Sequence, residues 1–339
     1  MRGYKKYFFS IISTLCLLCF CGCSTQIKQD VKQIRIAHDN GIQTPIHKAF
    51  IHFEKLVEEK SDHQIDVILF PAAQMGSVID TYEQVRRGDV EMSATTTSNL
   101  VSSIPEFSMW ESFYMFDDAD HAKRVLEGPA GIEMMESLER MNLKGIGYMA
   151  LGFRNFSNSK RPIIEAKDVK GLKMRGYNPL QIAAWSAVGA APTSVSWNEL
   201  FTSLQQKLID GQECAINSFY LEKFYEAQKY LSLTKHIFTN FLWFANAEFI
   251  ESLSKEEYDI IMESAKEAID YNWQLVSEIE QDTLKLLEES GIEINELDQD
   301  ARREMGEKMN HAIKDEIVKM CGEEVYNSVF EEIEKARQN

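Results

Sequence analysis

Cysteine is scarce in most of this sequence. Of the six cysteines, four lie in the segment that ends at Cys23, and only Cys214 and Cys321 remain in the rest of the 339 residues. Secreted folds that are held together by disulfides need several paired cysteines. We therefore expect no disulfide framework, and with 44% hydrophobic residues the chain can bury a core instead.

Positive charge is also scarce. The chain has 36 lysines and arginines against 53 acidic residues, a formal net charge of −17. Residues 1–22 hold three of the bases and no acid, so removing them would lower the net charge to −20. No basic stripe with interleaved aromatic residues is present, and such a surface repels nucleic acid. We predict no nucleic-acid partner.

Motifs for metal, cofactor and covalent chemistry are missing too. There is no HExxH, no paired-cysteine spacing beyond Cys23 and no GxSxG. The glycines of "GIGYMA" (145–150), with Asp168 about 20 residues on, match a dinucleotide loop only in spacing, because "GFRNF" rather than a helix follows them. We interpret these glycines as allowing close strand packing, and we predict no metal, no cofactor and no enzymatic activity.

The N-terminus carries a targeting pattern. Three bases precede the 14-residue apolar run "YFFSIISTLCLLCF", which is too short to span a bilayer comfortably, and "CGCS" places small residues around Cys23. We predict a lipoprotein signal peptide over 1–22, lipidation of Cys23 and a tether over 23–33, which would put the protein on a membrane surface in an exported compartment. Phe20 stands where such signals usually have leucine, so a soluble protein cleaved nearby is the alternative.

The rest of the chain alternates strands and helices. Residues 34–37 and 64–70 have strand patterns, and the apolar residues of 46–57 between them have helical spacing. The alternation continues to about residue 216, and long amphipathic helices begin near residue 253. This order predicts an α/β fold with helices on both faces of its sheets.

Two arginines stand at the ends of predicted strands. Arg154 follows "GF" at the end of one such run, and Arg175 ends "DVKGLKMR". Ligand crevices in α/β folds form at strand ends, and an arginine fork can hold a carboxylate through two parallel hydrogen bonds. Each arginine alone could equally belong to a surface ion pair.

A run of ordered motifs resembles the solute-binding proteins of TRAP (tripartite ATP-independent periplasmic) transporters, of the dicarboxylate- and sialic-acid-binding kind. The motifs, spread over roughly 34–335, are "FPAAQMGS", "IPEFSMWESFYMF", "GFRNFSNSKRPI" with "DVKGLKMR", "GAAPTSVSWNELFTSLQQKLIDGQE" and "FYEAQKYLSLTKH". The resemblance implies a two-domain α/β fold of the type II periplasmic-binding-protein kind, with discontinuous domains and long C-terminal helices. We place the N-terminal domain at 34–152 plus about 241–280, and the C-terminal domain at 153–240 plus about 281–339.

The resemblance also implies roles for single residues. Arg175 would make the main salt bridge to the ligand carboxylate, Arg154 would support the same carboxylate, and Trp197 would line the cleft. A core-packing tryptophan is the alternative for Trp197.

The chain departs from the sialic-acid-binding relatives in several places. Cys214 stands where those relatives often have a ligand-contacting asparagine, and Thr96 and Asn99 stand where they have an acid and an arginine. Further candidates to reach ligand hydroxyls are His38, Asp39 and Asn217.

We therefore predict a periplasmic, lipid-anchored, monomeric receptor that captures a small organic acid, a sugar acid such as a uronate, and delivers it to the TRAP membrane permease. A secreted enzyme acting on acidic sugars and a ligand-presenting sensor module are the alternatives.

Overall fold

The computed structural model describes residues 31–338. The predicted signal peptide, Cys23 and the tether up to residue 30 lie outside the described residues. The first strand begins at Lys32, so residues 32 and 33 belong to the sheet rather than to the tether. No helix among the described residues is both long enough and apolar enough to cross a membrane.

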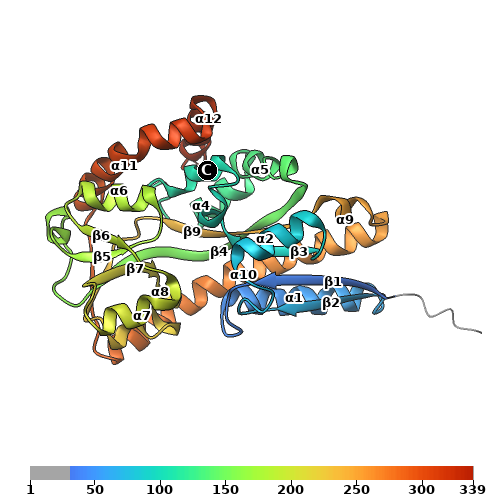
Figure 1. Cartoon of the computed structure of the whole chain (residues 1–339), viewed down its shortest axis with the longest axis horizontal. Helices are drawn as coiled ribbons and strands as arrows, with labels where there is room; N and C mark the ends of the chain where they lie inside the picture. The colour runs from blue at the N-terminus through green and yellow to red at the C-terminus, as the bar shows by residue number, and fades with distance from the viewer. Residues whose placement is uncertain (1–30, 339) are drawn as a thin grey trace, which may run out of the picture.

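Strands and helices alternate along the described chain (Figure 1). The strands are β1 (Lys32–His38), β2 (Ile65–Phe70), β3 (Met92–Thr96), β4 (Leu143–Asn158), β5 (Lys173–Gly176), β6 (Ala191–Ser194), β7 (Gly211–Ala215), β8 (Tyr230–Leu233), β9 (Phe238–Asn246) and β10 (Glu293–Glu296). The α-helices are α1 (Pro45–Lys60), α2 (Val78–Arg87), α3 (Thr97–Leu100), α4 (Ala119–Glu127), α5 (Pro129–Glu136), α6 (Pro179–Ala187), α7 (Trp197–Gln205), α8 (Ile216–Leu221), α9 (Ala247–Glu251), α10 (Lys255–Glu289), α11 (Gln299–Cys321) and α12 (Glu323–Ala336). The 3-10 helices are η1 (Pro105–Glu111), η2 (Glu139–Met141), η3 (Ala166–Val169) and η4 (Phe224–Glu226).

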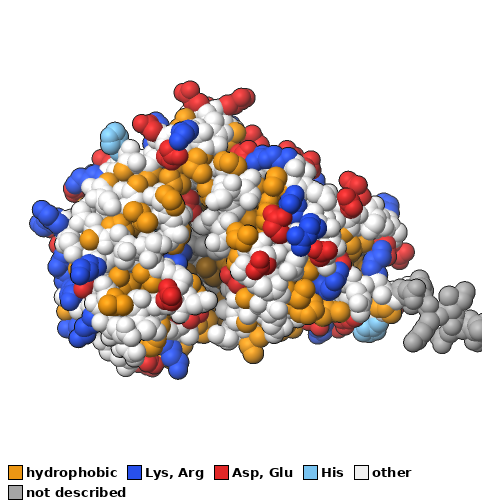
Figure 2. All heavy atoms as spheres, in the orientation of Figure 1, with side chains coloured by type: hydrophobic (Ala, Val, Ile, Leu, Met, Phe, Trp, Pro, Cys, Tyr) orange, Lys and Arg blue, Asp and Glu red, His pale blue; other side chains and the backbone are white. Residues whose placement is uncertain are grey.

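Strand β4 joins two groups of strands. The strand order is β2-β1-β3-β9-β4-β7-β5-β6, with β8 paired to β4 and β10 paired to β8. Residues 143–153 of β4 pair antiparallel with β9, whereas residues 154–158 pair with β7. We call the part around β1, β2, β3 and β9 the first lobe, and the part around β5 to β8 the second lobe. A furrow between the two lobes is visible in Figure 2.

Strand β4 has an irregular backbone where it passes from one lobe to the other. The register of β4 against β9 shifts between Ala150 and Gly152, and Gly152 has φ +111°, which favours glycine. A β-bulge of this kind bends the strand where it changes partner. Gly147, in the predicted glycine pattern, allows close packing of a helix rather than of a strand, since a Cβ there would lie 2.5 Å from Ile269 of α10.

Helix α10 is the second connection between the lobes. It has 35 residues, begins with a capping box formed by Ser254 and Glu257, and contacts α1 in the first lobe and α8 in the second (Figure 1). Where β4 has a strand on one side only, α10 supplies partners on the other: Asn272 accepts a hydrogen bond of 2.6 Å from the Ala150 N–H, and the Trp273 indole donates to the Tyr148 carbonyl at 3.0 Å. The helix therefore satisfies the exposed edge of β4.

The predicted α/β class is confirmed. The predicted strands at 34–37 and 64–70 lie within two residues of β1 and β2, whereas α1 extends three residues beyond the predicted end at residue 57. Helix α2 ends at Gly88, which has the left-handed conformation that favours glycine. The sequence patterns did not predict β6, β8, β9 or β10. Strand β9 is buried along its whole length, so its sequence shows no alternation of polar and apolar residues. Helix α11 contacts both η1, which lies in the predicted N-terminal domain, and α6, which lies in the predicted C-terminal domain. Helix α12 contacts α4 and α5 of the predicted N-terminal domain. The predicted domain boundaries stay a prediction.

Candidate functional site

Two arginines from different strands lie beside one aromatic ring in the second lobe. Arg154 lies on β4 and Arg175 on β5, and each side chain is largely buried, with about 9% of the residue exposed. The Tyr177 ring lies 4.8 Å from the Arg154 guanidinium carbon and 5.4 Å from that of Arg175. The structure thus brings together the two arginines that the sequence predicted, and the tyrosine ring makes a cation–π contact with both. We call Arg154, Arg175 and Tyr177 the arginine cluster.

Arg154 is already neutralised by the protein. Its Nε and Nη2 atoms donate to the Glu213 carboxylate, Nη2 also donates to the Glu213 carbonyl at 2.7 Å, and Nη1 donates to Thr239 at 3.3 Å. A guanidinium has five N–H donors, so this arrangement leaves one of them free. Arg154 can therefore add at most a single hydrogen bond to a ligand.

The charges of this pair stabilise each other. Burial alone would lower the pKa of Arg154, but the Glu213 carboxylate outweighs it and raises that pKa. Burial alone would raise the pKa of Glu213, but Arg154 and a hydrogen bond from His236 hold it well below its usual range. Burial lowers the pKa of His236, whose Nε2 lies 2.9 Å from the Glu213 carboxylate. The group is a closed, neutral ion pair with a neutral histidine beside it.

Arg175, by contrast, has no anionic partner. Its Nε donates to the Val195 carbonyl at 3.0 Å, but it forms no salt bridge with any residue of 31–338, and its two terminal NH2 groups donate to none of them. Burial, and then the nearby charge of Arg154, lower its pKa. A buried cation without a counterion is costly, so this position favours an incoming anion.

Trp197 lies beside the Arg175 guanidinium. The Arg175 guanidinium carbon lies 5.3 Å from the Trp197 ring centre, and the Trp197 ring meets Phe224 edge to face at 5.3 Å. Trp197 is half-buried at the start of α7. It therefore both packs against the core and presents aromatic surface beside the free arginine.

A buried carboxylate connects this cluster to the first lobe. Glu111 of η1 accepts hydrogen bonds from Tyr177 at 3.1 Å and from Gln181 at 2.8 Å, and its other oxygen accepts from Ser98 of α3. Sequence reasoning missed Glu111, Tyr177 and Glu213. Glu111 belongs to the motif "IPEFSMWESFYMF" and Glu213 ends the motif that closes with "DGQE", so both lay inside motifs already singled out, whereas Tyr177 stands two residues after "DVKGLKMR".

Residues 36–319 match the family described as bacterial extracellular solute-binding protein, family 7. This span covers most of the chain. The chain belongs to this family.

Relatives of the solute-binding protein cover nearly its whole length. It is 31% identical, over 85% of this chain and 88% of the relative, to the 2,3-diketo-L-gulonate-binding periplasmic protein YiaO of Escherichia coli (strain K12). The sugar acid binding protein DctPAm of Advenella mimigardefordensis strain DPN7T, solved with galactonate, is 30% identical with a TM-score of 0.83, covering 91% of this chain and 100% of that one. A TRAP periplasmic solute binding protein of Chromohalobacter salexigens DSM 3043, solved with D-glucuronate, is 25% identical with a TM-score of 0.83, covering 89% and 99%.

These comparisons confirm the predicted family, the two-domain fold and the general function. The protein is an extracytoplasmic solute-binding protein of a TRAP-type transporter, which binds a small organic acid and is not an enzyme. None of them tests the roles of single residues, which stay predictions.

Two candidates of the second lobe are committed to packing. Cys214 is 2% exposed, lies on the face of β7 opposite to Glu213, and belongs to the apolar core of the lobe; burial raises the pKa of its thiol to about 12. Asn217 of α8 is buried and accepts a hydrogen bond of 3.0 Å from Thr283 of α10. Ligand contact by either residue stays a prediction.

Three candidates lie where strands of the first lobe end. Asp39 directly follows β1 and is accessible to solvent. Its carboxylate accepts a hydrogen bond of 3.0 Å from Asn40, and partial desolvation by the surrounding protein raises its pKa. Thr96 ends β3, and the exposed Asn99 donates to Thr95 at 2.9 Å. These side chains offer hydroxyl, amide and carboxylate groups, and none of them is a cation.

His38 points into the core of the first lobe instead of the cleft. It is 1% exposed, stacks on Phe50 at 5.2 Å, and its Nε2 lies 3.2 Å from His47 Nδ1. Burial, and then the neighbouring His47, lower its pKa to about 3. His38 therefore acts in this structure as a neutral core side chain.

The buried His38 should make stability depend on pH. Its unfolded pKa is the ordinary 6.5 and its folded pKa is about 3, so its stabilising contribution is full above pH 6.5 and is lost as the pH falls below that value. Between pH 7 and pH 5 the loss from this one group is about 2 kcal/mol. Urea denaturation of His38→Gln at both pH values should show a correspondingly smaller difference than the wild type. The exposed His311→Gln variant serves as control, and an equal difference in all three proteins would contradict the prediction.

The other bases of the central motif serve the surface. Arg161 donates to the carbonyls of Asp168 at 2.7 Å and Lys170 at 2.8 Å, and Lys160 pairs with Asp210 at 3.2 Å. Neither has a contact to Arg154, Arg175 or Tyr177, so Arg154 is the one base of "GFRNFSNSKRPI" in the arginine cluster, and its contact with the ligand stays a prediction.

Proposed function

We propose that the ligand is a monocarboxylate that bears hydroxyl groups, a sugar acid such as a uronate or an aldonate, and that Arg175 holds its carboxylate. The observation that carries the proposal is the difference between the two arginines. Glu213 neutralises Arg154, whereas among residues 31–338 Arg175 meets no anion and has four N–H donors left. A carboxylate can take two of these donors in parallel.

The charges around the cluster favour one carboxylate over two. Arg175 is the unpaired cation of the arginine cluster, and the first-lobe candidates Asp39, Thr96 and Asn99 carry no positive charge. A second carboxylate on the ligand would approach the Asp39 carboxylate rather than a base. Hydroxyl groups, in contrast, can donate to Asp39 and bond to Thr96 and Asn99.

The relatives support this choice of ligand class. The Escherichia coli relative is a 2,3-diketo-L-gulonate-binding protein, and galactonate and D-glucuronate are bound in the two solved structures. Each is a hydroxylated acid with one carboxylate. The Trp197 ring beside Arg175 adds an apolar face that suits the C–H face of a sugar.

Delivery and attachment belong to the same proposal. The captured acid passes to a TRAP membrane permease, and a lipid on Cys23 holds the protein, as a monomer, at a membrane of the bacterial envelope. The "CGCS" sequence after the apolar run supports the anchor.

A thermal-shift titration tests the ligand class. D-glucuronate and D-galactonate should raise the melting temperature, because a ligand bound only by the native state stabilises it. At equal concentration, succinate should raise it less, and neutral D-galactose should leave it unchanged. A larger shift with succinate, or an equal one with galactose, would contradict a hydroxylated monocarboxylate as the ligand.

A further inference from the structure

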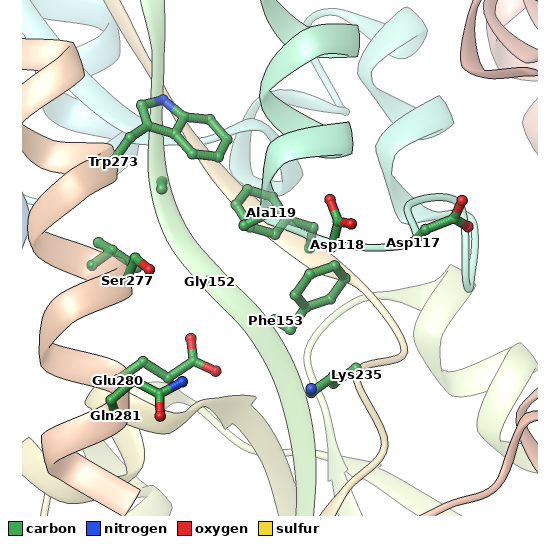
Figure 3. Close-up of a pocket in the computed structure, with 13 residues that line it drawn as sticks. Asp117, Asp118, Ala119, Gly152, Phe153, Lys235, Trp273, Ser277, Glu280 and Gln281 are labelled. Carbon is green, nitrogen blue, oxygen red and sulfur yellow. The ribbon is translucent and has the colours of Figure 1, made fainter. Parts of the chain in front are cut away.

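A second recess lies at the crossing between the lobes, and none of the candidate ligand residues lines it. We call it the hinge pocket. It has a volume of about 180 Å³, and its walls come from the bulge of β4, the start of β9, the middle of α10 and the residues before α4 (Figure 3). A cavity of about 150 Å³ holds a benzene ring, so the hinge pocket has room for a small molecule.

The floor of the hinge pocket is aromatic. Phe153 meets Phe238 edge to face at 5.1 Å, and Phe238 stacks on Trp273 of α10 at 5.3 Å. All three side chains are more than nine-tenths buried by the fold, and all three line the recess. Such a floor favours an apolar group of the occupant.

Two opposite charges face the hinge pocket without neutralising each other. Glu280 projects from α10, and Lys235 projects from the loop between β8 and β9 toward it (Figure 3). They form no salt bridge, and neither side chain has a hydrogen-bond partner among residues 31–338. Burial raises the pKa of Glu280, with Lys235 opposing this more weakly, so the carboxylate lacks compensation for its desolvation.

The other acids of the pocket are occupied. Asp118 caps α4 by accepting from the His121 N–H at 2.7 Å, and Asp117 pairs with Arg337 at 3.1 Å. The unsatisfied charges are therefore one carboxylate and one ammonium, which face each other beside the aromatic floor (Figure 3). This arrangement complements a molecule that carries both an ammonium and a carboxylate.

We propose that the hinge pocket is a second binding site, for an apolar α-amino acid. The amino group of the ligand pairs with Glu280, its carboxylate pairs with Lys235, and its side chain covers Phe153, Phe238 and Trp273. Each of the two pairs is a charge-assisted contact in a partly desolvated place.

The position of the pocket couples it to the cleft. Lys235 belongs to the second lobe, Glu280 to the helix that spans both lobes, and Gly152 at the bulge lies between them, with Glu280 Oε2 3.6 Å from the place of its Cβ. A molecule that binds both Lys235 and Glu280 stabilises one position of the second lobe relative to α10. The coupling rests on the proposed function and on closure of the two lobes around the captured acid. Filling the pocket then changes acid affinity by about fivefold or more.

Calorimetric titration of the acid-free protein with L-leucine tests the site. Leucine should bind, whereas 4-methylpentanoate, which lacks the amino group, and 3-methylbutylamine, which lacks the carboxylate, should bind about tenfold or more weakly. Glu280→Gln and Lys235→Met should weaken leucine binding by a similar factor. Glu278→Gln, an exposed position on the same helix, should not.

Two outcomes would overturn the site: no heat with leucine, or leucine binding that both Glu280→Gln and Lys235→Met leave intact. Folding of each variant is checked by its melting temperature and by its binding of D-glucuronate. The Arg175→Met variant separates this site from the cleft, since it should lose the acid and still bind leucine. Loss of leucine there would place leucine in the cleft and overturn the hinge-pocket assignment. A D-glucuronate affinity that saturating leucine leaves unchanged would contradict the coupling alone.

Discussion

Replacing Arg175 by methionine should weaken binding of D-glucuronate or D-galactonate by about 10- to 150-fold. Arg175 carries the unpaired charge of the cluster, and a hydrogen bond between charged groups contributes about 1.5–3 kcal/mol net. The same variant should be more stable than the wild type without ligand, because methionine removes a buried cation that has no anionic partner among residues 31–338. Calorimetry of binding and urea denaturation of the ligand-free protein measure the two effects.

Two variants serve as controls for this result. Arg161→Met removes an arginine whose donors go to the carbonyls of Asp168 and Lys170, so acid affinity should stay as in the wild type. Arg175→Lys keeps the charge but loses the fork, and its affinity should fall between those of methionine and arginine. If Arg175→Met bound the acid with wild-type affinity, Arg175 would not be part of the binding site, and the proposed function would lose its main support.

Replacing Glu213 by alanine should lower the free energy of unfolding by about 3–5 kcal/mol. The substitution removes the carboxylate that neutralises the buried Arg154, and breaking a buried pair on one side leaves an uncompensated charge. Because the folded pKa of Glu213 lies below its ordinary 4.5, its contribution is full above pH 4.5 and is lost as the pH falls below it. The loss should therefore be measured by urea denaturation at neutral pH.

A surface pair provides the matched control. Glu293 pairs with Lys229 at 2.9 Å, but both side chains are more than half exposed, so Glu293→Ala should cost about 1 kcal/mol or less. Equal losses for the two variants would contradict a structural role of the Arg154–Glu213 pair. Glu213→Ala should also free donors of Arg154, so the ligand should stabilise this variant at least as much as it stabilises the wild type.

The ordered motifs of the sequence predicted more about this protein than its hydrophobic periodicity did. Ordered motifs from "FPAAQMGS" to "FYEAQKYLSLTKH" indicated the family, the two-domain fold and the binding of an organic acid, all of which the comparisons confirm. Periodicity found β1, α1, β2 and the long α10, because these elements have one buried face or strong caps. It missed β9, which is buried on both faces and therefore has no pattern of period two.

Side-chain direction was the part that the sequence did not show. His38 directly precedes Asp39 at the end of β1, yet it turns into the core onto Phe50, whereas Asp39 is accessible. Neighbouring residues of a strand point to opposite faces, so adjacency in sequence cannot tell which of two polar residues meets a ligand. The same alternation sends Cys214 into the core of the second lobe while Glu213 meets Arg154.

The sequence by itself determined that two arginines stand at the ends of strands in an acidic chain. Only the tertiary structure decided that they are not equivalent. Arg154 and Glu213 are 59 residues apart and meet because β4 pairs with β7 in one register, with Phe156 opposite Glu213. No such pairing brings an acid to Arg175. The charge of a buried side chain is compensated by whatever the sheet register places beside it, and that register is a property of the folded chain.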